Sequence, residues 1–114
     1  TIKENNIPVK FAIFNNNNLG MVRQWQEIFH EKNYVAVNYT GNPDFVKLAE
    51  AFGILGLRVD KRSDIVDTIR KASEHDGPVV IDFVLPPEES VYPMIPAGTS
   101  TEQLMEEPER GVTR

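Results

Sequence analysis

Four consecutive asparagines, residues 15–18, are the part of the sequence best suited to bind a ligand. An apolar run at residues 11–14 precedes them and predicts a buried strand, and helical spacing of apolar residues begins after Gly20. A strand, a polar turn and a helix start bring amide oxygens and backbone N–H groups to the positive end of a helix dipole. Anions and their metal ions bind at such junctions. The alternative is a plain polar loop, because asparagine is a common turn residue.

The residues after Gly20 predict an amphipathic helix. Its apolar side is a stripe of five side chains at helical spacing: Met21, Val22, Trp25, Ile28 and Phe29. Charged and amide side chains, among them Arg23, Gln24 and Glu27, occupy the other side. Packing against the rest of the protein is the simpler interpretation of the stripe, and contact with a cofactor or substrate is the alternative.

The rest of the chain predicts the elements that must position this turn. They are a strand at residues 9–14, a helix at 21–31, a helix at 43–52, a strand at 55–59, a helix at 63–75 and a strand at 79–85. Asn42 is the predicted cap of the second helix, and Gly53 follows its end. The last strand is almost continuously apolar, which is typical of parallel sheets. We therefore predict an α/β fold, with helices packed on a parallel sheet and an irregular C-terminal tail.

Composition limits the classes of protein to which the chain can belong. Its 114 residues suffice for one domain with a modest core. A net charge of −5 argues against a general nucleic-acid binder, which needs basic patches to displace phosphate counterions. No apolar stretch predicts a membrane span. The chain has no cysteine, which excludes disulfides and thiolate metal sites and suits a reducing compartment, so we expect a cytoplasmic protein.

Four motifs together give the sequence a specific resemblance. They are Asn-Asn-Asn-Asn-Leu-Gly-Met-Val-Arg-Gln-Trp-Gln at residues 15–26, Pro-Asp-Phe-Val-Lys-Leu-Ala-Glu-Ala at 43–51, Gly-Pro-Val-Val-Ile-Asp at 77–82 and Val-Tyr-Pro-Met-Ile-Pro at 91–96. With these motifs in this order, the sequence resembles the end of the large catalytic subunit of acetohydroxyacid synthase, also called acetolactate synthase. The resemblance covers nearly the whole chain, and residues 19–26 are its most specific part. It implies the C-terminal part of a parallel-sheet domain that binds thiamine diphosphate.

The resemblance implies a metal site in the asparagine turn. Asn16 matches the asparagine whose side-chain oxygen binds Mg²⁺, and Asn18 matches the position that offers its main-chain carbonyl oxygen. Mg²⁺ prefers such hard oxygen ligands and bridges diphosphate oxygens. Because Asn15 and Asn16 are adjacent, either amide remains a candidate for the side-chain ligand.

The resemblance also implies contacts with the organic cofactor and with the substrate. Gly20 would let the backbone approach the diphosphate, and the N–H groups of Leu19, Gly20 and Met21 would stabilise its charge. Met21 and Val22 match residues beside the cofactor. Trp25 matches a residue at the substrate channel. Plain core packing is the alternative role for Met21 and Trp25.

In the family that this sequence resembles, thiamine diphosphate and Mg²⁺ support decarboxylation of pyruvate and its condensation with a second 2-oxo acid, on the route to branched-chain amino acids. The resemblance further implies a homodimer or tetramer, a regulatory small subunit, and FAD bound by another domain. The aspartate that shares the Mg²⁺ belongs to an upstream Gly-Asp-Gly type motif that this sequence lacks, and the activating glutamate comes from another domain. We therefore assign no catalytic residue here and expect the isolated chain, a fragment or processed product, to be inactive.

Residues 1–86 are expected to form the C-terminal part of the cofactor-binding domain, and residues 87–114 a lid-like tail over the active site. Two alternative functions stay open at this point. One is another thiamine-diphosphate enzyme, of the glyoxylate carboligase or pyruvate oxidase type, although we would not expect it to share residues 21–26. The other is a stand-alone α/β interaction module without catalytic activity.

Overall fold

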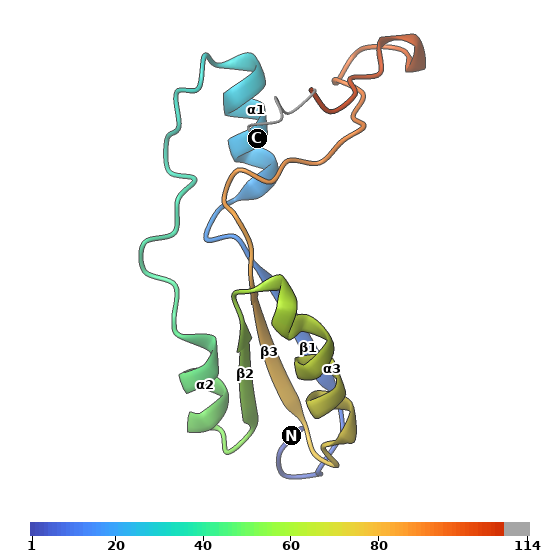
Figure 1. Ribbon diagram of the computed structural model, residues 1–114. Coiled ribbons are helices and arrows are strands. Elements are labelled where there is room, and N and C mark those ends of the chain that lie inside the picture. Colours follow the sequence, from blue (N-terminus) through green and yellow to red (C-terminus); the bar gives the residue numbers. More distant parts are fainter. Residues whose placement is uncertain (109–114) are drawn as a thin grey trace.

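The computed structural model describes residues 1–108 and contains a parallel sheet with helices on both faces (Figure 1). The elements are β1 (Lys10–Asn15), α1 (Gly20–Phe29), α2 (Phe45–Ala51), β2 (Leu55–Val59), α3 (Ile65–Glu74) and β3 (Val79–Val84), with short 3₁₀ helices at Arg62–Asp64 and Thr101–Gln103. The predicted α/β class and the predicted order of elements are confirmed. Within the described residues, no helix is long and apolar enough to cross a membrane.

The central strand of the sheet is β3, which pairs in parallel with β1 on one side and with β2 on the other. In this register Val79 lies opposite both Lys10 and Leu55, and Val84 lies opposite Asn15. Parallel strands with both faces covered are apolar along most of their length, which explains the composition of β3. Because all three strands run in the same direction, β1 delivers the asparagine turn to the carboxyl edge of the sheet.

The two sheet faces are covered by different helices, α3 on one and α2 on the other (Figure 1). Under α3 lies the hydrophobic core of the chain, formed by Val59, Ala72, Val79 and Ile81. On the opposite face α2 approaches β2 very closely at Gly56. A Cβ added to this glycine would lie 2.8 Å from the backbone carbonyl oxygen of Val46. Helix α2 can therefore pack this closely on β2 only because residue 56 is a glycine.

The first turn of α2 is capped by Asp44, whose carboxylate accepts hydrogen bonds from the N–H groups of Val46 (3.0 Å) and Lys47 (3.2 Å). The prediction of Asn42 as the cap is wrong, because Asp44 directly precedes the first helical residue and its side chain reaches both amides. The hydrogen bond from the Lys47 N–H is the main reason why the pKa of Asp44 lies below its usual value, and the Arg58 guanidinium lowers it further.

The Arg58 side chain joins β2 to both neighbouring elements. Its Nη2 lies 2.8 Å from Asp44, and its Nε lies 3.1 Å from the buried carboxylate of Asp82 on β3. Hydrogen bonds to Asp82 and Asp44 raise the pKa of Arg58. The guanidinium thus ties the cap of α2 to the central strand through one partly exposed cation.

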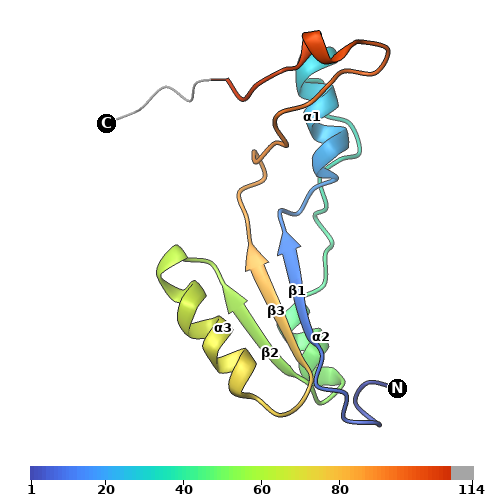
Figure 2. The same ribbon diagram turned by 90° about the vertical axis from the view of Figure 1, so that its right-hand side faces the viewer.

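The chain is elongated, with principal extents of 49 × 32 × 28 Å, and part of it lies beyond the carboxyl ends of the strands. There α1 projects away from the sheet, between two irregular segments (Figures 1 and 2). One is the connector, residues 30–44, which leads from α1 back to α2. The other is the strap, residues 88–95, which follows β3 and runs along α1.

The apolar stripe predicted to pack is exposed in this chain. Met21, Val22, Trp25 and Phe29 each keep between 45% and 49% of their surface accessible. The apolar side chains of α2 and α3, and of the residue after α2, are also buried only in part, because Ala49 and Ala72 are buried whereas Phe52 and Val66 are exposed. The helical spacing was interpreted correctly, but no element within residues 1–108 covers these side chains.

Candidate functional site

The asparagine turn lies between the end of β1 at Asn15 and the start of α1 at Gly20. Two overlapping side-chain turns shape it: the Asn15 Oδ1 accepts from the Asn17 N–H (3.2 Å), and the Asn16 Oδ1 accepts from the Asn18 N–H (3.1 Å). Asn17 adopts a left-handed conformation with φ of 53°, which asparagine tolerates better than most residues. Asparagine therefore suits the local backbone of this turn.

The connector holds this turn from one side. The Tyr39 N–H donates to the Asn17 carbonyl (2.8 Å), and the Leu19 N–H donates to the carbonyl of the buried residue Val37 (2.9 Å). The Asn42 Nδ2 donates to the Asn17 Oδ1 (3.0 Å). Three of the turn's backbone or side-chain groups are thus held by the connector.

Several oxygens of the turn have free acceptor capacity. The Asn16 Oδ1 accepts one hydrogen bond and has two lone pairs, and the Asn18 main-chain carbonyl accepts none from residues 1–108. The Asn18 Oδ1 is buried without a hydrogen-bond partner among the described residues. An uncharged amide oxygen and a main-chain carbonyl two residues apart suit a hard cation such as Mg²⁺ as part of a larger ligand set. The chemistry of these oxygens therefore fits the predicted metal.

The start of α1 provides the complementary site for an anion. No side chain caps this helix, so the N–H groups of Gly20 and Met21 lack a hydrogen-bond partner within the described residues. A Cβ on Gly20 would lie 3.0 Å from the Asn16 Nδ2, so the glycine allows the Asn16 amide to lie against the helix start. The Leu19 N–H, for which the resemblance implies the same role, donates to the Val37 carbonyl oxygen in this structure, and its contact with the diphosphate stays a prediction. Two of the three predicted amides remain available.

The side chains of the turn line a small pocket of about 170 Å³. Its walls come from the ends of β1 and α2 and from the connector: Ile13, Phe14, Asn15, Asn16, Asn17, Asn18, Tyr39, Asn42 and Phe45. Asn15 and Asn16 both face this pocket, but only Asn16 also packs against the helix start. Both amides therefore stay candidates for the predicted metal ligand.

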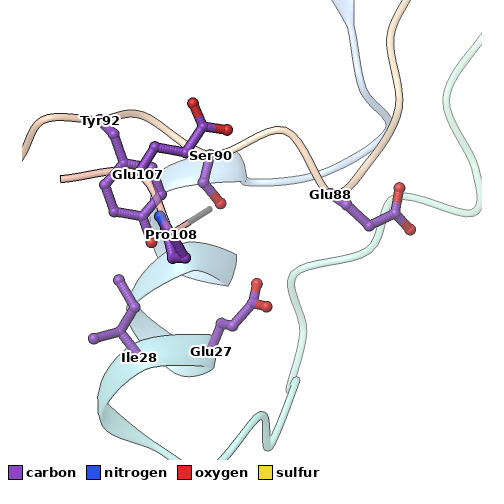
Figure 3. A pocket seen from close by; sticks show the side chains of 7 residues that line it. All are labelled: Glu27, Ile28, Glu88, Ser90, Tyr92, Glu107 and Pro108. Carbon is purple, nitrogen blue, oxygen red and sulfur yellow. The ribbon is translucent and has the colours of Figure 1, made fainter. Parts of the chain in front are cut away.

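A larger pocket of about 460 Å³ lies elsewhere, between α1 and the tail (Figure 3). Glu27, Glu88 and Glu107 are among its lining residues, and Glu27 pairs with Arg23 at 3.0 Å. Three carboxylates would repel a diphosphate, and none of the asparagines lines this pocket. Among residues 1–108, no cluster of three or more histidine, cysteine or acidic residues is arranged to hold a metal ion. We therefore place the candidate site at the smaller pocket.

The remaining predicted contact residues lie on the exposed side of α1. Met21 and Val22 belong to its first turn, directly after the free amides, and Trp25 lies one turn further along. The structure thus puts the first two beside the asparagine turn and Trp25 farther from it. Sequence reasoning missed Gln24, which it assigned to the polar side of α1. Only 1% of this residue is exposed, because the strap covers it. Its residue type gave no signal of this, since glutamine is mostly exposed in proteins.

Comparison with known proteins agrees with this geometry. Residues 1–83 match the family described as thiamine pyrophosphate enzyme, C-terminal TPP binding domain. The chain is 50% identical over 103 residues to the acetolactate synthase large subunit of Mycobacterium tuberculosis, which covers 86% of this chain and 17% of that protein. It is 42% identical to the mitochondrial acetolactate synthase of Schizosaccharomyces pombe over 105 residues, covering 92% of this chain and 16% of that protein.

A third relative is the large subunit of acetolactate synthase isozyme 2 of Escherichia coli, which is 35% identical over 106 residues. This match covers 93% of the chain described here and 19% of the relative. The chain thus spans less than a fifth of the length of each of these proteins. The resemblance to acetolactate synthase is confirmed, and the chain belongs to the thiamine pyrophosphate enzyme family, in the C-terminal domain that binds the cofactor.

Proposed function

We propose that residues 15–22 hold the metal and diphosphate end of thiamine diphosphate in an acetolactate synthase. The observation that carries the proposal is the pair of available oxygens on Asn16 and Asn18, directly before the uncapped start of α1. The oxygens would bind Mg²⁺, and the N–H groups of Gly20 and Met21 would donate to the diphosphate. One short turn would then bind both charges of the metal–diphosphate pair.

The residues around Asn16 and Asn18 would support the site in different ways. Gly20 leaves space for the Asn16 amide, since a Cβ would lie only 3.0 Å from its nitrogen. Asn17 fixes the turn through its left-handed backbone and its bond from Asn42. Met21 and Val22 would contact the cofactor beside the diphosphate, and Trp25 would line the approach of the substrate. Their exposure leaves these three side chains available for such contacts.

When bound, thiamine diphosphate supplies the carbanion chemistry by which pyruvate loses carbon dioxide and is joined to a second 2-oxo acid. The task of this chain is to orient the cofactor and to neutralise its diphosphate. No residue of the chain is proposed to transfer a proton. The full site would also need an aspartate for the metal and a glutamate for cofactor activation, both from outside this chain. We therefore propose that the chain alone forms no acetolactate.

The wider assignments follow from the acetolactate synthase relatives. We propose a cytoplasmic large subunit that assembles as a homodimer or tetramer with a regulatory small subunit, with FAD bound by another domain. Residues 1–86 would complete the cofactor-binding domain. Residues 87–114 would cover the site as a lid-like tail, whose last six residues, 109–114, lie outside the described structure.

A chimera tests this proposal in an active enzyme. Residues 1–108 would replace the matching segment of the Mycobacterium tuberculosis large subunit, to which the chain is 50% identical over 103 residues. We expect the chimera to form acetolactate from pyruvate, measured as acetoin after acidification, and to depend on thiamine diphosphate and Mg²⁺. Asn16→Ala should abolish the activity, whereas Asn15→Ala, the matched control, should retain most of it.

Two results would contradict the proposal. A chimera with the parent's oligomeric mass that makes no acetolactate would overturn the assignment to this reaction. An active chimera that tolerates Asn16→Ala would overturn the role of the turn. Size-exclusion chromatography with light scattering distinguishes these outcomes from a failure to assemble.

A further inference from the structure

Gln24 makes a paired contact with the main chain of a single residue in the strap. Its Nε2 donates to the Val91 carbonyl oxygen (2.9 Å), and its Oε1 accepts from the Val91 N–H (2.9 Å). The Nε2 also lies 3.3 Å from the Met94 sulfur. Only 1% of Gln24 is exposed, so these bonds are shielded from water. The amide thus pairs with Val91 as a neighbouring strand would.

Gln26 repeats this contact in the connector. Its Nε2 donates to the Val35 carbonyl oxygen (3.1 Å), and its Oε1 accepts from the Val35 N–H (3.0 Å). The next residue, Ala36, has a φ of 54°, and Val37 is buried. The connector is therefore fixed on either side of a strained residue, by Gln26 before it and by burial after it.

The two glutamines point to opposite sides of α1. Residues two positions apart in an α-helix are separated by about 200° around its axis. The connector and the strap accordingly run along opposite sides of α1 in both views (Figures 1 and 2). Trp25 lies between the glutamines in sequence and 48% of it is exposed. The side of the helix that carries Trp25 therefore lies between the strap and the connector, each held by one glutamine.

We propose that Gln24 and Gln26 are positioning residues. Each forms an amide clamp, which is the pair of hydrogen bonds from one glutamine side chain to the main chain of one residue. The two clamps hold the strap and the connector in place on either side of the Trp25 face. Only a primary amide of this length offers a donor and an acceptor together at this distance. Glutamate can only accept when ionised, and asparagine is one methylene shorter. If Trp25 lines the substrate approach, as the proposed function has it, the clamps fix the width of that approach. The clamps themselves require no cofactor, so their test is independent of cofactor binding.

Hydrogen exchange of backbone amides tests the clamps one at a time in the purified chain. Gln24→Met removes both hydrogen bonds at similar side-chain length, and should accelerate exchange at Val91 by about tenfold while leaving Val35 unchanged. Gln26→Met should do the reverse. Each variant is therefore the control for the other. The Ile81 amide on the central strand reports whether the sheet remains folded.

A result in which neither variant accelerates exchange would overturn the proposal. Equal acceleration at Val91 and Val35 in either variant, with Ile81 still protected, would also overturn it, because the segments would then form one unit. If a methionine variant also exposes Ile81, the Gln→Glu variants take its place, since they keep the acceptor and lose only the donor. They should accelerate exchange in the same clamped segment, by less than tenfold, and are judged by the same two criteria.

Discussion

The sheet with α2 and α3 and the region around α1 are held together by different interactions. In the sheet, apolar side chains such as Val79 and Ile81 are buried, and the strands pair in a continuous register. Around α1, the apolar side chains are exposed and a polar one, Gln24, is buried. The contacts that organise this second region are hydrogen bonds from side-chain amides, to backbone groups at Val91 and Val35 and to a side-chain oxygen at Asn17.

This difference predicts that the two parts of the chain contribute unequally to its stability. Burial of apolar surface is the main source of folding free energy, so the sheet should carry most of the stability of the chain. Amide bonds to irregular backbone add little net free energy but fix geometry closely. The candidate site lies at the junction of the two regions, where β1 ends and α1 begins.

The largest expected effect on stability comes from shortening a buried apolar side chain in the sheet, compared with an exposed one on α1. Ile81→Ala removes a core side chain of which only 5% is exposed, and should lower the free energy of unfolding by about 3 kcal/mol. Phe29→Ala on α1, with 49% exposed, should change it by less than about 0.5 kcal/mol. Urea denaturation followed by circular dichroism measures both. Equal losses in the two variants would contradict the division between the regions.

A second comparison uses two glycines. Gly56→Ala would place a Cβ 2.8 Å from the Val46 carbonyl oxygen, and should cost about 2 kcal/mol because α2 must move away from the sheet. Gly41→Ala in the connector meets nothing within 4 Å and should have little effect. Thermal unfolding of both variants checks this. If Gly56→Ala is tolerated as well as its control, the close approach of α2 is not required for stability.

The smallest effect concerns acid sensitivity at the contact between α2 and the sheet. The pKa of Asp44 in the folded chain lies below its usual value, chiefly through the Lys47 N–H and also through Arg58. The ionised carboxylate therefore stabilises the fold above this value, and the contribution disappears as the pH falls through the lowered pKa.

Asp44→Asn isolates the charge, because asparagine also caps helices. The variant should be less stable than the wild type at neutral pH, and the difference should shrink below pH 3.8. Urea denaturation between pH 6 and pH 2 measures it. A difference that stays constant over this range would show that the charge of Asp44 makes no contribution.

Much of the fold could be predicted from local patterns. The apolar run of β3, the glycine after α2 and the spacing of three helices each reflect local rules that operate within a few residues. The sequence could not predict which apolar stripes are covered. Spacing shows which residues share one side of a helix, but it does not show whether another element packs on that side. Trp25 and Val66 illustrate this, since both follow the helical pattern and both are exposed.

The candidate site was predictable in its residues but not in its hydrogen bonds. The position of Asn16 and Gly20 between strand and helix followed from the sequence and from its resemblance to acetolactate synthase. The loss of the Leu19 amide to Val37 depends on a contact across eighteen positions of the chain, and the burial of Gln24 depends on the strap sixty-seven residues away. Such long-range contacts leave no mark on local sequence patterns.

The most direct test of the proposed site is paramagnetic broadening of the chain's amide resonances by Mn²⁺ in the presence of thiamine diphosphate. Mn²⁺ shares the preference of Mg²⁺ for oxygen ligands and broadens signals close to it. We predict selective broadening at Asn16, Asn18 and Gly20, lost in Asn16→Ala and kept in Asn15→Ala. Broadening centred on Glu27, Glu88 and Glu107 at the larger pocket, or none that depends on Asn16, would contradict the assignment of the turn as the metal and diphosphate site.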